Sequence, residues 1–333
     1  MREVTPEEAV CVVKPGQRMY FQGGAATPHV LIEALVARAA ELRDVEIVHL
    51  HTDGEAPHVR PEMSGHFRHN ALFIGANTRD AVNEGRADYT PVFLSEIPQM
   101  FKAGGSLPLD VAFIHVSPPD TDGNCTLGVS VDCALAAAWN ARTVVAQVNP
   151  NMPRTSGHSL PASLITYGVQ VDEELPEAPA ARTCDEFEQI GGHVAQLVQD
   201  GSTLQLGIGG VPNAVLARLG DHRDLGIHTE MFTDGVLPLV EAGVINGARK
   251  TLHPGVKSDC RSVVRITSTS FRCSASGTPR TGSFSPPGRT GVARGRQVGG
   301  RVRWALVADV DIRRRPGGCH LGCRHVRVPG VAA

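Results

Sequence analysis

The stretch from Leu204 to Gly235 constrains the fold of this chain more than any other, because it repeats one structural step twice. In the first step an apolar run, Thr203 to Ile208, opens into the sequence Gly209-Gly210-Val211-Pro212. A segment with apolar residues at helical spacing, Asn213 to Leu219, follows. This order of patterns predicts a strand, a tight loop and a helix.

The second step places a carboxylate where a strand is expected to end. A short apolar run, Leu225 to Thr229, is followed directly by Glu230, and Asp234-Gly235 then turns the chain into a predicted helix at Leu237 to Ala242. Ligands of open α/β sheets bind in the crevice beyond the carboxyl ends of the strands. The sequence therefore predicts that Glu230 is placed for chemistry.

The glycines of the first step do not match a dinucleotide-binding site. That site needs G-x-G-x-x-G between strand and helix, and here Gly207 and Gly209 are followed by Pro212 at the position of the third glycine. Glycines at a helix start can still present backbone N–H groups to an anion. An ordinary strand-to-helix turn explains the same residues, and both interpretations remain open.

The earlier chain alternates between the two kinds of element, which predicts parallel βαβ units. The predicted strands are Arg18–Phe21, Val45–His51, Ala71–Ile74, Tyr89–Phe93, Asp110–Val116 and Thr143–Val148. The predicted helices are Pro6–Val13, His29–Leu42, Thr78–Gly85, Leu94–Lys102 and Val131–Ala141. Thr5 is expected to be an N-cap, followed by Pro6 at the first helical position and two early acids. A capping box is expected at Thr183 to Glu186, where a further helix begins.

The N-terminus, MREVTPEEAV, is acidic and has no apolar core, so the sequence predicts a cytoplasmic protein without a membrane span. Four histidines between His51 and His69 suggest a metal site, but they show no H-x-x-x-H spacing. A polar loop with some substrate-facing residues is the preferred interpretation, and no metal site is predicted. The Cys319 to His325 segment likewise departs from the common zinc-finger spacing.

The charge divides the chain sharply at about residue 257. Residues 1–257 contain 18 Lys and Arg against 31 Asp and Glu, a formal charge of −13, whereas residues 258–333 contain 14 Arg against 3 Asp, a formal charge of +11. The second part has no Lys, Glu, Asn, Tyr or Met. This bias is typical of a shifted reading frame in GC-rich DNA, so the tail is expected to be out of frame and not to form a compact domain. The only apolar stretch beyond Thr267 that could form a strand is Trp304 to Val310.

Several segments of the first 255 residues resemble one family. They are GIGGVPNAVL, LGIHTEMFTDGV and VINGARKTLHPG around Glu230, and RHNALFIGANTRDAVNEGRADYTPVFLSEIP, LPLDVAFIHVSPPDTDGNCTLGVSVD and VAQVNPNMPRT before them. Together they closely resemble the acetyl-CoA hydrolase/transferase family, which includes 4-hydroxybutyrate and butyrate–acetate CoA-transferases. Family members continue past the HPG sequence into another α/β portion, which is not recognisable here.

The resemblance implies a mechanism and a set of site residues. The glutamate of the IHTEM sequence is the family's nucleophile, which corresponds to Glu230, and the reaction is ping-pong transfer of CoA between carboxylates through an acyl-glutamyl anhydride and a glutamyl-CoA thioester. Coenzyme A and acyl-CoA are implied as substrates, with no permanently bound cofactor. The CoA-binding residues implied are Gly207, Gly209, Gly210 and Pro212, and the substrate-binding residues implied are Gly24, Ala25, Asn149 and Arg154.

The fold implied is α/β, with CoA-transferase-like open sheets that carry helices on both faces and with an incomplete second domain. The first domain is expected at residues 1–172, a linker at 173–182, the part of the second domain with the glycine loop and Glu230 at 183–257, and the tail at 258–333. The expected partners are acyl-CoA and small carboxylates. A complete chain is expected to form a homo-oligomer, without a membrane or nucleic-acid partner.

Other functions remain open at this point. The chain could be an inactive fragment, or an acyl-CoA thioester hydrolase if water intercepts the anhydride. A serine hydrolase is disfavoured, because Gly157-His158-Ser159-Leu160-Pro161 lacks the second glycine of a nucleophile elbow. The run Arg313-Arg314-Arg315 suggests a basic nucleic-acid-binding tail, but no binding module accompanies it. Taken alone, without the surrounding IHTEM sequence, Glu230 is better explained as an acid near a helix start.

Overall fold

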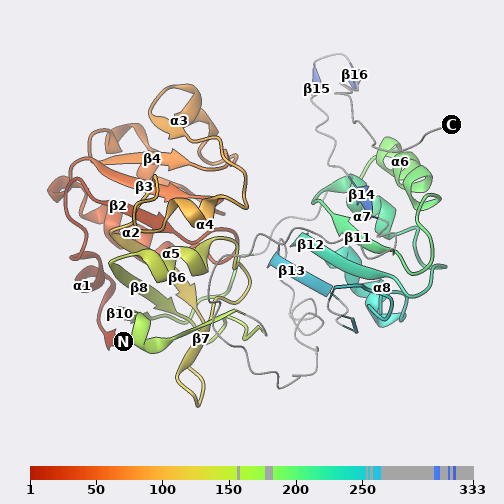
Figure 1. Ribbon diagram of the computed structural model, residues 1–333. Coiled ribbons are helices and arrows are strands. Elements are labelled where there is room, and N and C mark those ends of the chain that lie inside the picture. Colours follow the sequence, from red (N-terminus) through yellow and green to blue (C-terminus); the bar gives the residue numbers. More distant parts are fainter. Residues whose placement is uncertain are drawn as a thin grey trace.

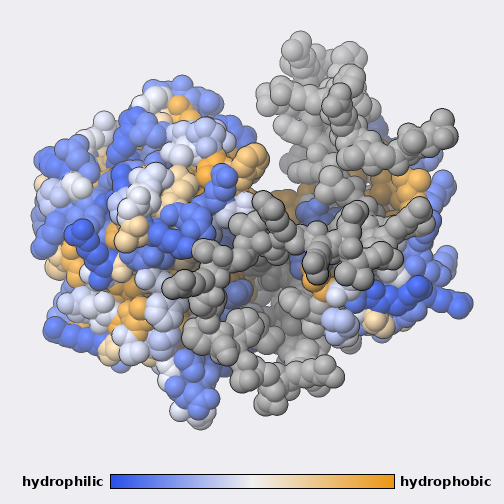
Figure 2. Space-filling model, viewed as in Figure 1, coloured by the Kyte–Doolittle hydropathy of each residue, from blue (hydrophilic) through white to orange (hydrophobic). Residues whose placement is uncertain are grey.

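The computed structural model describes residues 1–155, 158–176, 183–252 and 254–255, and the strands at 258–263, 304–307, 314–315 and 318–319. The described chain forms two lobes, each built around a parallel sheet with helices packed on it (Figure 1). The predicted α/β class is therefore confirmed. In the face shown in Figure 2, hydrophilic residues cover most of the first lobe.

The first lobe contains an eight-stranded sheet with the order β1-β10-β8-β6-β2-β3-β4-β5. All of its pairs are parallel. Its strands are β1 (Arg2–Glu3), β2 (Arg18–Phe21), β3 (Val45–His49), β4 (Phe67–Ala71), β5 (Ala87–Tyr89), β6 (Val111–Val116), β8 (Thr143–Val148) and β10 (Tyr167–Gln170). A separate antiparallel pair is formed by β7 (Asn124–Thr126) and β9 (Ser159–Pro161).

Both faces of this sheet are buried, and successive residues of its central strands serve the two faces in turn. Along β2, Met19 and Phe21 belong to one apolar cluster, whereas Tyr20 belongs to the other. Helices α1 (Pro6–Val10) and α2 (His29–Ala37) contribute to the cluster of Met19, and helices α4 (Ile97–Met100) and α5 (Ala134–Asn140) contribute to that of Tyr20. Strands of a parallel sheet that is covered on both sides read as continuous apolar runs, which explains why β6 and β8 were recognisable in the sequence.

The helices of the first lobe are shorter than their sequence patterns suggested. They are α1 (Pro6–Val10), α2 (His29–Ala37), α3 (Arg79–Asn83), α4 (Ile97–Met100) and α5 (Ala134–Asn140), with 3₁₀ turns η1 (Ala39–Glu41), η2 (Pro57–Val59), η3 (Pro61–Met63) and η4 (Ala162–Leu164). The N-cap predicted at Thr5 is confirmed, since the Thr5 hydroxyl accepts from the Glu8 N–H. The Glu8 carboxylate also accepts from the Thr5 N–H, which completes a capping box that the sequence prediction did not include.

Two strand predictions in this lobe were wrong in position. The strand expected at Ala71–Ile74 is β4, which ends at Ala71, and the strand expected at Tyr89–Phe93 is β5, which ends at Tyr89. The polar residues of these strands hid them, because their side chains find partners across neighbouring strands. Arg68 of β4 forms an ion pair with Asp88 of β5.

The second lobe contains a parallel sheet with the order β13-β12-β11-β14. Its strands are β11 (Thr203–Leu206), β12 (Gly226–Phe232), β13 (Ser258–Val263) and β14 (Trp304–Val307), and its helices are α6 (Asp185–Ala195), α7 (Gly210–Leu216) and α8 (Leu237–Glu241), with η5 at Asp234–Val236. A two-stranded pair is formed by β15 (Arg314–Arg315) and β16 (Gly318–Cys319). The strand predicted at Trp304 to Val310 corresponds to β14.

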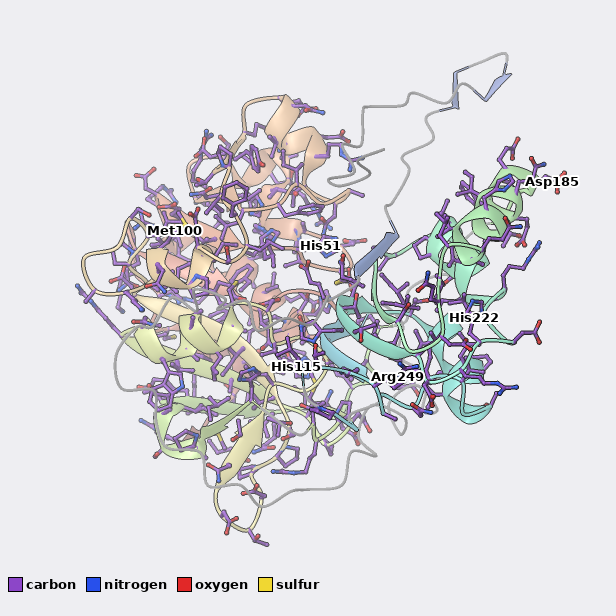
Figure 3. The ribbon with its side chains drawn as sticks, turned by 45° about the vertical axis from the view of Figure 1, so that its right-hand side comes forward. His51, Met100, His115, Asp185, His222 and Arg249 are labelled. Atoms are coloured by element: carbon purple, nitrogen blue, oxygen red, sulfur yellow. The ribbon has the colours of Figure 1, made fainter. Side chains whose placement is uncertain are left out.

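The capping box predicted at Thr183 to Glu186 was wrong. Helix α6 begins after Cys184 rather than Thr183, and no side chain caps it. Asp185, which Figure 3 labels, is instead the first of three acidic residues in its first turn, where a negative charge is favourable. Apart from its four short strands, the predicted tail at 258–333 lies outside the described residues, as do residues 177–182 of the predicted linker. The domain boundaries therefore stay predictions.

Candidate active site

Glu230 lies inside β12, two residues before its end, and its side chain is exposed. The prediction that the strand ends at Glu230 was wrong because pairing with β13 continues β12 through Met231 and Phe232. Pairing with β11 is shorter, however, and stops at Leu204 opposite Ile227. Glu230 thus stands beyond the end of the β11 pairing, on the side where the glycine loop leaves β11.

The Thr229 side chain holds β12 against the last residue of β11. Its hydroxyl accepts a hydrogen bond from the Leu206 N–H at 3.0 Å and donates one to the Leu206 carbonyl at 2.7 Å. These two hydrogen bonds join β11 and β12 beyond the point where the backbone pairing of the two strands ends. Thr229 is 6% exposed, so water does not compete with this contact.

A second threonine fixes β12 to the helix that follows the glycine loop. The Thr233 hydroxyl donates to the Asn213 side-chain oxygen in α7 at 2.8 Å. Glu230 therefore lies between two threonine contacts that reach the two ends of the loop. Neither threonine was recognised in the sequence, although a Thr-Glu-x-x-Thr sequence opposite a glycine loop could have indicated them.

At one position of the glycine loop, the backbone conformation itself requires glycine. Gly209 precedes the first residue of α7 with φ of 115° and ψ of −168°, a region that is essentially restricted to glycine. Gly207 and Gly210 are half-buried. Pro212 is buried inside the first turn of α7, where its missing N–H costs no intrahelical hydrogen bond.

The predicted substrate loop at Gly24 and Ala25 is tied to the end of β3. The Gly24 N–H donates to the His51 carbonyl at 2.6 Å, and the backbone of Gly24 has a φ of 58°. Ala25 is 1% exposed and packs in a small apolar cluster with Met152. The structure thus brings this loop together with the turn that follows β8.

The Asn149 side chain, also predicted to bind substrate, is buried and bonded within the protein. Its amide group donates to the Glu173 carbonyl at 2.8 Å, and its oxygen accepts from the Asn151 N–H at 3.0 Å and the Glu173 N–H at 3.4 Å. Asn149 therefore holds the chain that leaves β10, and any contact with substrate would compete with these bonds.

Arg154 is bonded to the turn that precedes β7. Its guanidinium donates to the Asp120 carboxylate at 2.7 Å and to the carbonyls of Pro118 and Asn124. The Asn124 N–H and Arg154 both lower the pKa of Asp120. The carboxylates of this turn organise the loop, as expected from its turn-forming residues, because Asp120 also accepts from the Asp122 N–H.

The interpretation of residues 51–69 as a polar loop was wrong for His58 and His69. These side chains are 2% and 1% exposed and lie against His49. The three side chains are the one group of possible metal ligands found among the described residues. The sequence did not show this because His49 and His69 lie on adjacent parallel strands, 20 residues apart in the chain.

Comparison with known proteins places this architecture in a family. The acetyl-CoA hydrolase/transferase N-terminal domain matches residues 2–179. The chain belongs to the acetyl-CoA hydrolase/transferase family. It is 48% identical over 253 residues to the 4-hydroxybutyrate coenzyme A transferase of Clostridium kluyveri, a match that covers 76% of this chain and 59% of the relative. The chain spans a little over half the length of the curated relatives it matches.

Solved structures support the family fold in both lobes. The 4-hydroxybutyrate CoA-transferase of Porphyromonas gingivalis superposes with a TM-score of 0.71 at 37% identity, over 83% of this chain and 65% of that one. RipA from Yersinia pestis gives a TM-score of 0.77 at 29% identity, over 83% of this chain and 66% of that one. Among the described residues, no helix has the length and apolar character that crossing a bilayer requires.

Proposed function

We propose that this member of the family is an acyl-CoA:carboxylate CoA-transferase with Glu230 as its nucleophile. The observation that carries the proposal is the placement of the exposed Glu230 carboxylate between the Thr229 and Thr233 contacts, opposite the loop at Gly207 to Gly210. A fixed backbone lowers the entropy cost of bringing a nucleophile to its substrate. The named CoA-transferases among its relatives support the same reaction class.

The reaction consists of four exchanges between carboxylates and a thiolate. Glu230 attacks the thioester carbonyl of the donor acyl-CoA, and CoA leaves as the thiolate, which gives an acyl-glutamyl anhydride. The thiolate then attacks the glutamyl carbonyl and releases the donor carboxylate, which leaves glutamyl-CoA. The acceptor carboxylate attacks this thioester, and the thiolate returns to the acceptor acyl group. The last step forms the new acyl-CoA and restores Glu230.

The remaining site assignments belong to the same proposal. Backbone N–H groups of Gly207, Gly209 and Gly210 are proposed to approach CoA, because glycine leaves room for close contact. Pro212 is proposed to fix the first turn of α7, the helix that follows these glycines. Gly24, Ala25 and Asn149 are proposed to shape the substrate cavity from the first lobe, and Arg154 to receive a substrate carboxylate in exchange for Asp120. The short carboxylates named for the relatives, 4-hydroxybutyrate and acetate, are the first substrates to test.

Trapping of the covalent intermediate tests the nucleophile. The chain is incubated with acetyl-CoA or 4-hydroxybutyryl-CoA without an acceptor, and peptides are mapped by mass spectrometry. We expect a CoA adduct on the peptide that contains Glu230, its loss in Glu230→Gln, and its retention in Glu241→Gln, a control that changes another exposed glutamate in the same lobe. An adduct on a different residue, or no adduct on the unchanged chain, contradicts the proposal.

The same assay separates transfer from hydrolysis. With a carboxylate acceptor present, a transferase converts each consumed thioester into a new one, and the amount of free thiol stays constant. A hydrolase releases one thiol for each thioester whether or not the acceptor is present, because water takes the place of the acceptor. We expect acceptor-dependent formation of new acyl-CoA. Equal thiol release with and without acceptor would identify a hydrolase instead.

A further inference from the structure

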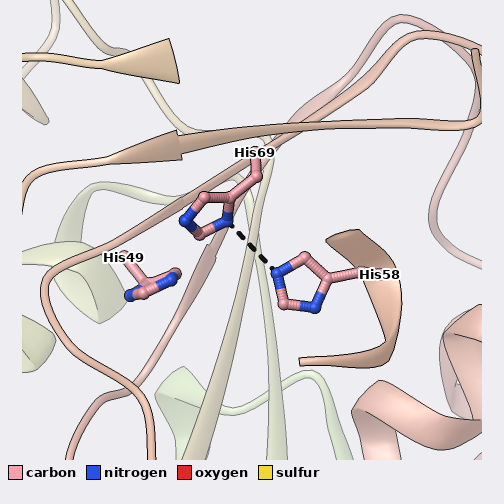
Figure 4. Close-up of side chains that lie close together, drawn as sticks. All are labelled: His49, His58 and His69. Atoms are coloured by element: carbon pink, nitrogen blue, oxygen red, sulfur yellow. Dashed lines mark hydrogen bonds between the residues drawn. The ribbon is translucent and has the colours of Figure 1, made fainter. Parts of the chain in front are cut away.

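Three histidines of the first lobe converge on one point, far in sequence from Glu230. His49 is the last residue of β3, His69 lies in the middle of β4, and His58 lies in the short η2 turn between these strands (Figure 4). Their exposed fractions are 0%, 2% and 1% for His49, His58 and His69. One possible ligand atom from each lies within 4.8 Å of the other two.

The folded chain leaves most of these ring nitrogens without partners. His58 Nε2 and His69 Nδ1 lie 3.2 Å apart. Both nitrogens of His49, Nδ1 of His58 and Nε2 of His69 have no hydrogen-bond partner in the part of the chain that the structure describes. A buried polar group that stays unpaired costs about 1 to 3 kcal/mol. An ion held by His58 Nε2, His69 Nδ1 and one nitrogen of His49 would give that His49 nitrogen the partner it lacks.

The surroundings of the three imidazoles are apolar. Phe21 packs edge-on against His58 with ring centroids 5.4 Å apart, and Phe67 lies in the apolar cluster on the same face of the sheet. No carboxylate belongs to the cluster, which disfavours Mg²⁺ and Ca²⁺.

The geometry suits a tetrahedral ion. Two nitrogens bound to zinc at about 2.0 to 2.1 Å lie about 3.4 Å apart. The separation of 3.2 Å between His58 Nε2 and His69 Nδ1 is close to this value. Binding would draw the His49 nitrogen inward by up to about 1.4 Å. A cavity of ≈ 10 Å³ borders His58 and His69 but not His49, and Arg60 and Arg86 also line it. Its volume is about the room that one water needs as a partner for a ring N–H.

We propose that His49, His58 and His69 bind one Zn²⁺ ion that fastens the segment between β3 and β4 to the sheet. Residues 50–66 form this segment and contain η2 and η3 but no strand of the large sheet. A bond through His58 would hold the segment to both strands at once. The site is structural, because it lies in a buried apolar cluster of the first lobe, whereas the proposed nucleophile lies in the second.

Zinc titration of the full-length chain tests this site. The chain is stripped of metal with a chelator and titrated with Zn²⁺ by calorimetry and by thermal unfolding. We expect one equivalent to bind at the cluster and to raise Tm by about 5 °C at a hundredfold excess over Kd. His58→Gln/His69→Gln should lose that equivalent and that shift. His115→Gln should keep both, because His115 is equally buried but lies outside the cluster.

The four cysteines after residue 257 could bind zinc through their thiols, so the site needs a readout that identifies the ligands. X-ray absorption of the zinc-loaded wild-type chain with these cysteines alkylated requires no histidine variant to fold. We expect a first shell of nitrogen and oxygen with imidazole scattering. The proposal is overturned if the alkylated chain binds no zinc, or if the double histidine variant binds zinc with the same stoichiometry and the same rise in Tm.

Discussion

The two lobes use polar residues near the carboxyl ends of their strands in opposite ways. In the first lobe the Asn149 side chain is buried and Arg154 is bonded to a turn, so both already stabilise the protein. In the second lobe Glu230 is exposed, while Thr229 and Thr233 bond to the segments around the glycine loop. In the first lobe the buried Asn149 and the exposed Arg154 are therefore both bonded to neighbouring backbone, whereas the second lobe holds the exposed carboxylate of Glu230 on a fixed strand.

This contrast predicts that substitutions will separate into two classes. A residue whose polar atoms are bonded inside the protein should affect the free energy of unfolding more than the chemistry. A residue that is exposed on a fixed backbone should affect the chemistry more than the free energy of unfolding. The following tests are ordered by the size of the effect expected.

The largest effect is expected from Glu230→Gln. Loss of the proposed nucleophile should lower kcat for the proposed CoA transfer by about 10³-fold or more, while Tm stays within about 2 °C because the side chain is exposed. Steady-state kinetics and thermal unfolding measure the two quantities. If Tm falls by much more than about 2 °C together with the activity, Glu230 also stabilises the fold, and the contrast between the lobes is lost.

Acid should weaken the first lobe through His115, which lies in β6 (Figure 3). Burial, and to a smaller extent the charge of His29, lower the pKa of His115 to about 4 from its ordinary value of 6.5. The unfolded chain binds a proton below pH 6.5 that the folded chain does not bind until about pH 4. Stability is therefore full above pH 6.5 and falls as the pH drops toward 4, by up to about 3 kcal/mol.

Urea unfolding at a series of pH values between 4.5 and 7.5 measures this loss. In His115→Gln the free energy of unfolding should depend less steeply on pH over this range. The difference in slope should correspond to about one proton fewer taken up on unfolding. An unchanged slope would show that His115 does not remain neutral in the folded protein. The other buried histidines should preserve part of the slope in the variant, because burial also lowers the pKa of His69 to about 4.

Asn149→Ala should lower the free energy of unfolding by about 2 kcal/mol. The reason is that the backbone N–H and carbonyl of Glu173 lose the partners that bind them in the interior. The activity of the molecules that remain folded should change less than their stability. Chemical unfolding and kcat, measured at a temperature where the variant is folded, test this; a stable but inactive variant would instead support direct contact with substrate.

Thr229→Val should lower activity by about tenfold with a loss of about 1 to 2 kcal/mol in stability. Valine has the same shape as threonine but leaves the buried Leu206 N–H and carbonyl without the hydroxyl. Thr229→Ser keeps the hydroxyl and should restore most of the activity if the contact positions Glu230. If the serine and valine variants have equal activity, the hydroxyl has no positioning role.

The smallest effect on stability is expected from Gly210→Ala. Gly210 is the first residue of α7, where alanine favours the helix by up to about 1 kcal/mol. An ordinary turn therefore predicts equal or higher Tm and unchanged KM, whereas close approach of CoA to the loop predicts a raised KM. A substitution of Gly209 cannot separate these interpretations, because its φ of 115° makes any side chain unfavourable at that position.

Much of the architecture was predictable because apolar runs mark buried parallel strands. The strand predictions at Arg18–Phe21 and Thr143–Val148 match β2 and β8 at both ends. The strands with polar side chains were misplaced, since β4 carries the exposed Arg68, which pairs with the exposed Asp88 of β5, and neither strand therefore forms an apolar run. When the partner of a side chain lies on another strand, the sequence around that side chain contains no pattern that reveals the pairing.

The sequence by itself determined the α/β class, the glycine loop and the resemblance on which the proposal of Glu230 as nucleophile rests. Local patterns suffice for these, because strands, turns and helix starts depend on neighbouring residues. Only the tertiary structure decided that Thr229 and Thr233 hold β12 around Glu230, that Asn149 is bonded internally, and that His49, His58 and His69 converge. Each of these depends on which strands lie side by side, because the pairing of parallel strands brings together side chains that are many residues apart in the chain.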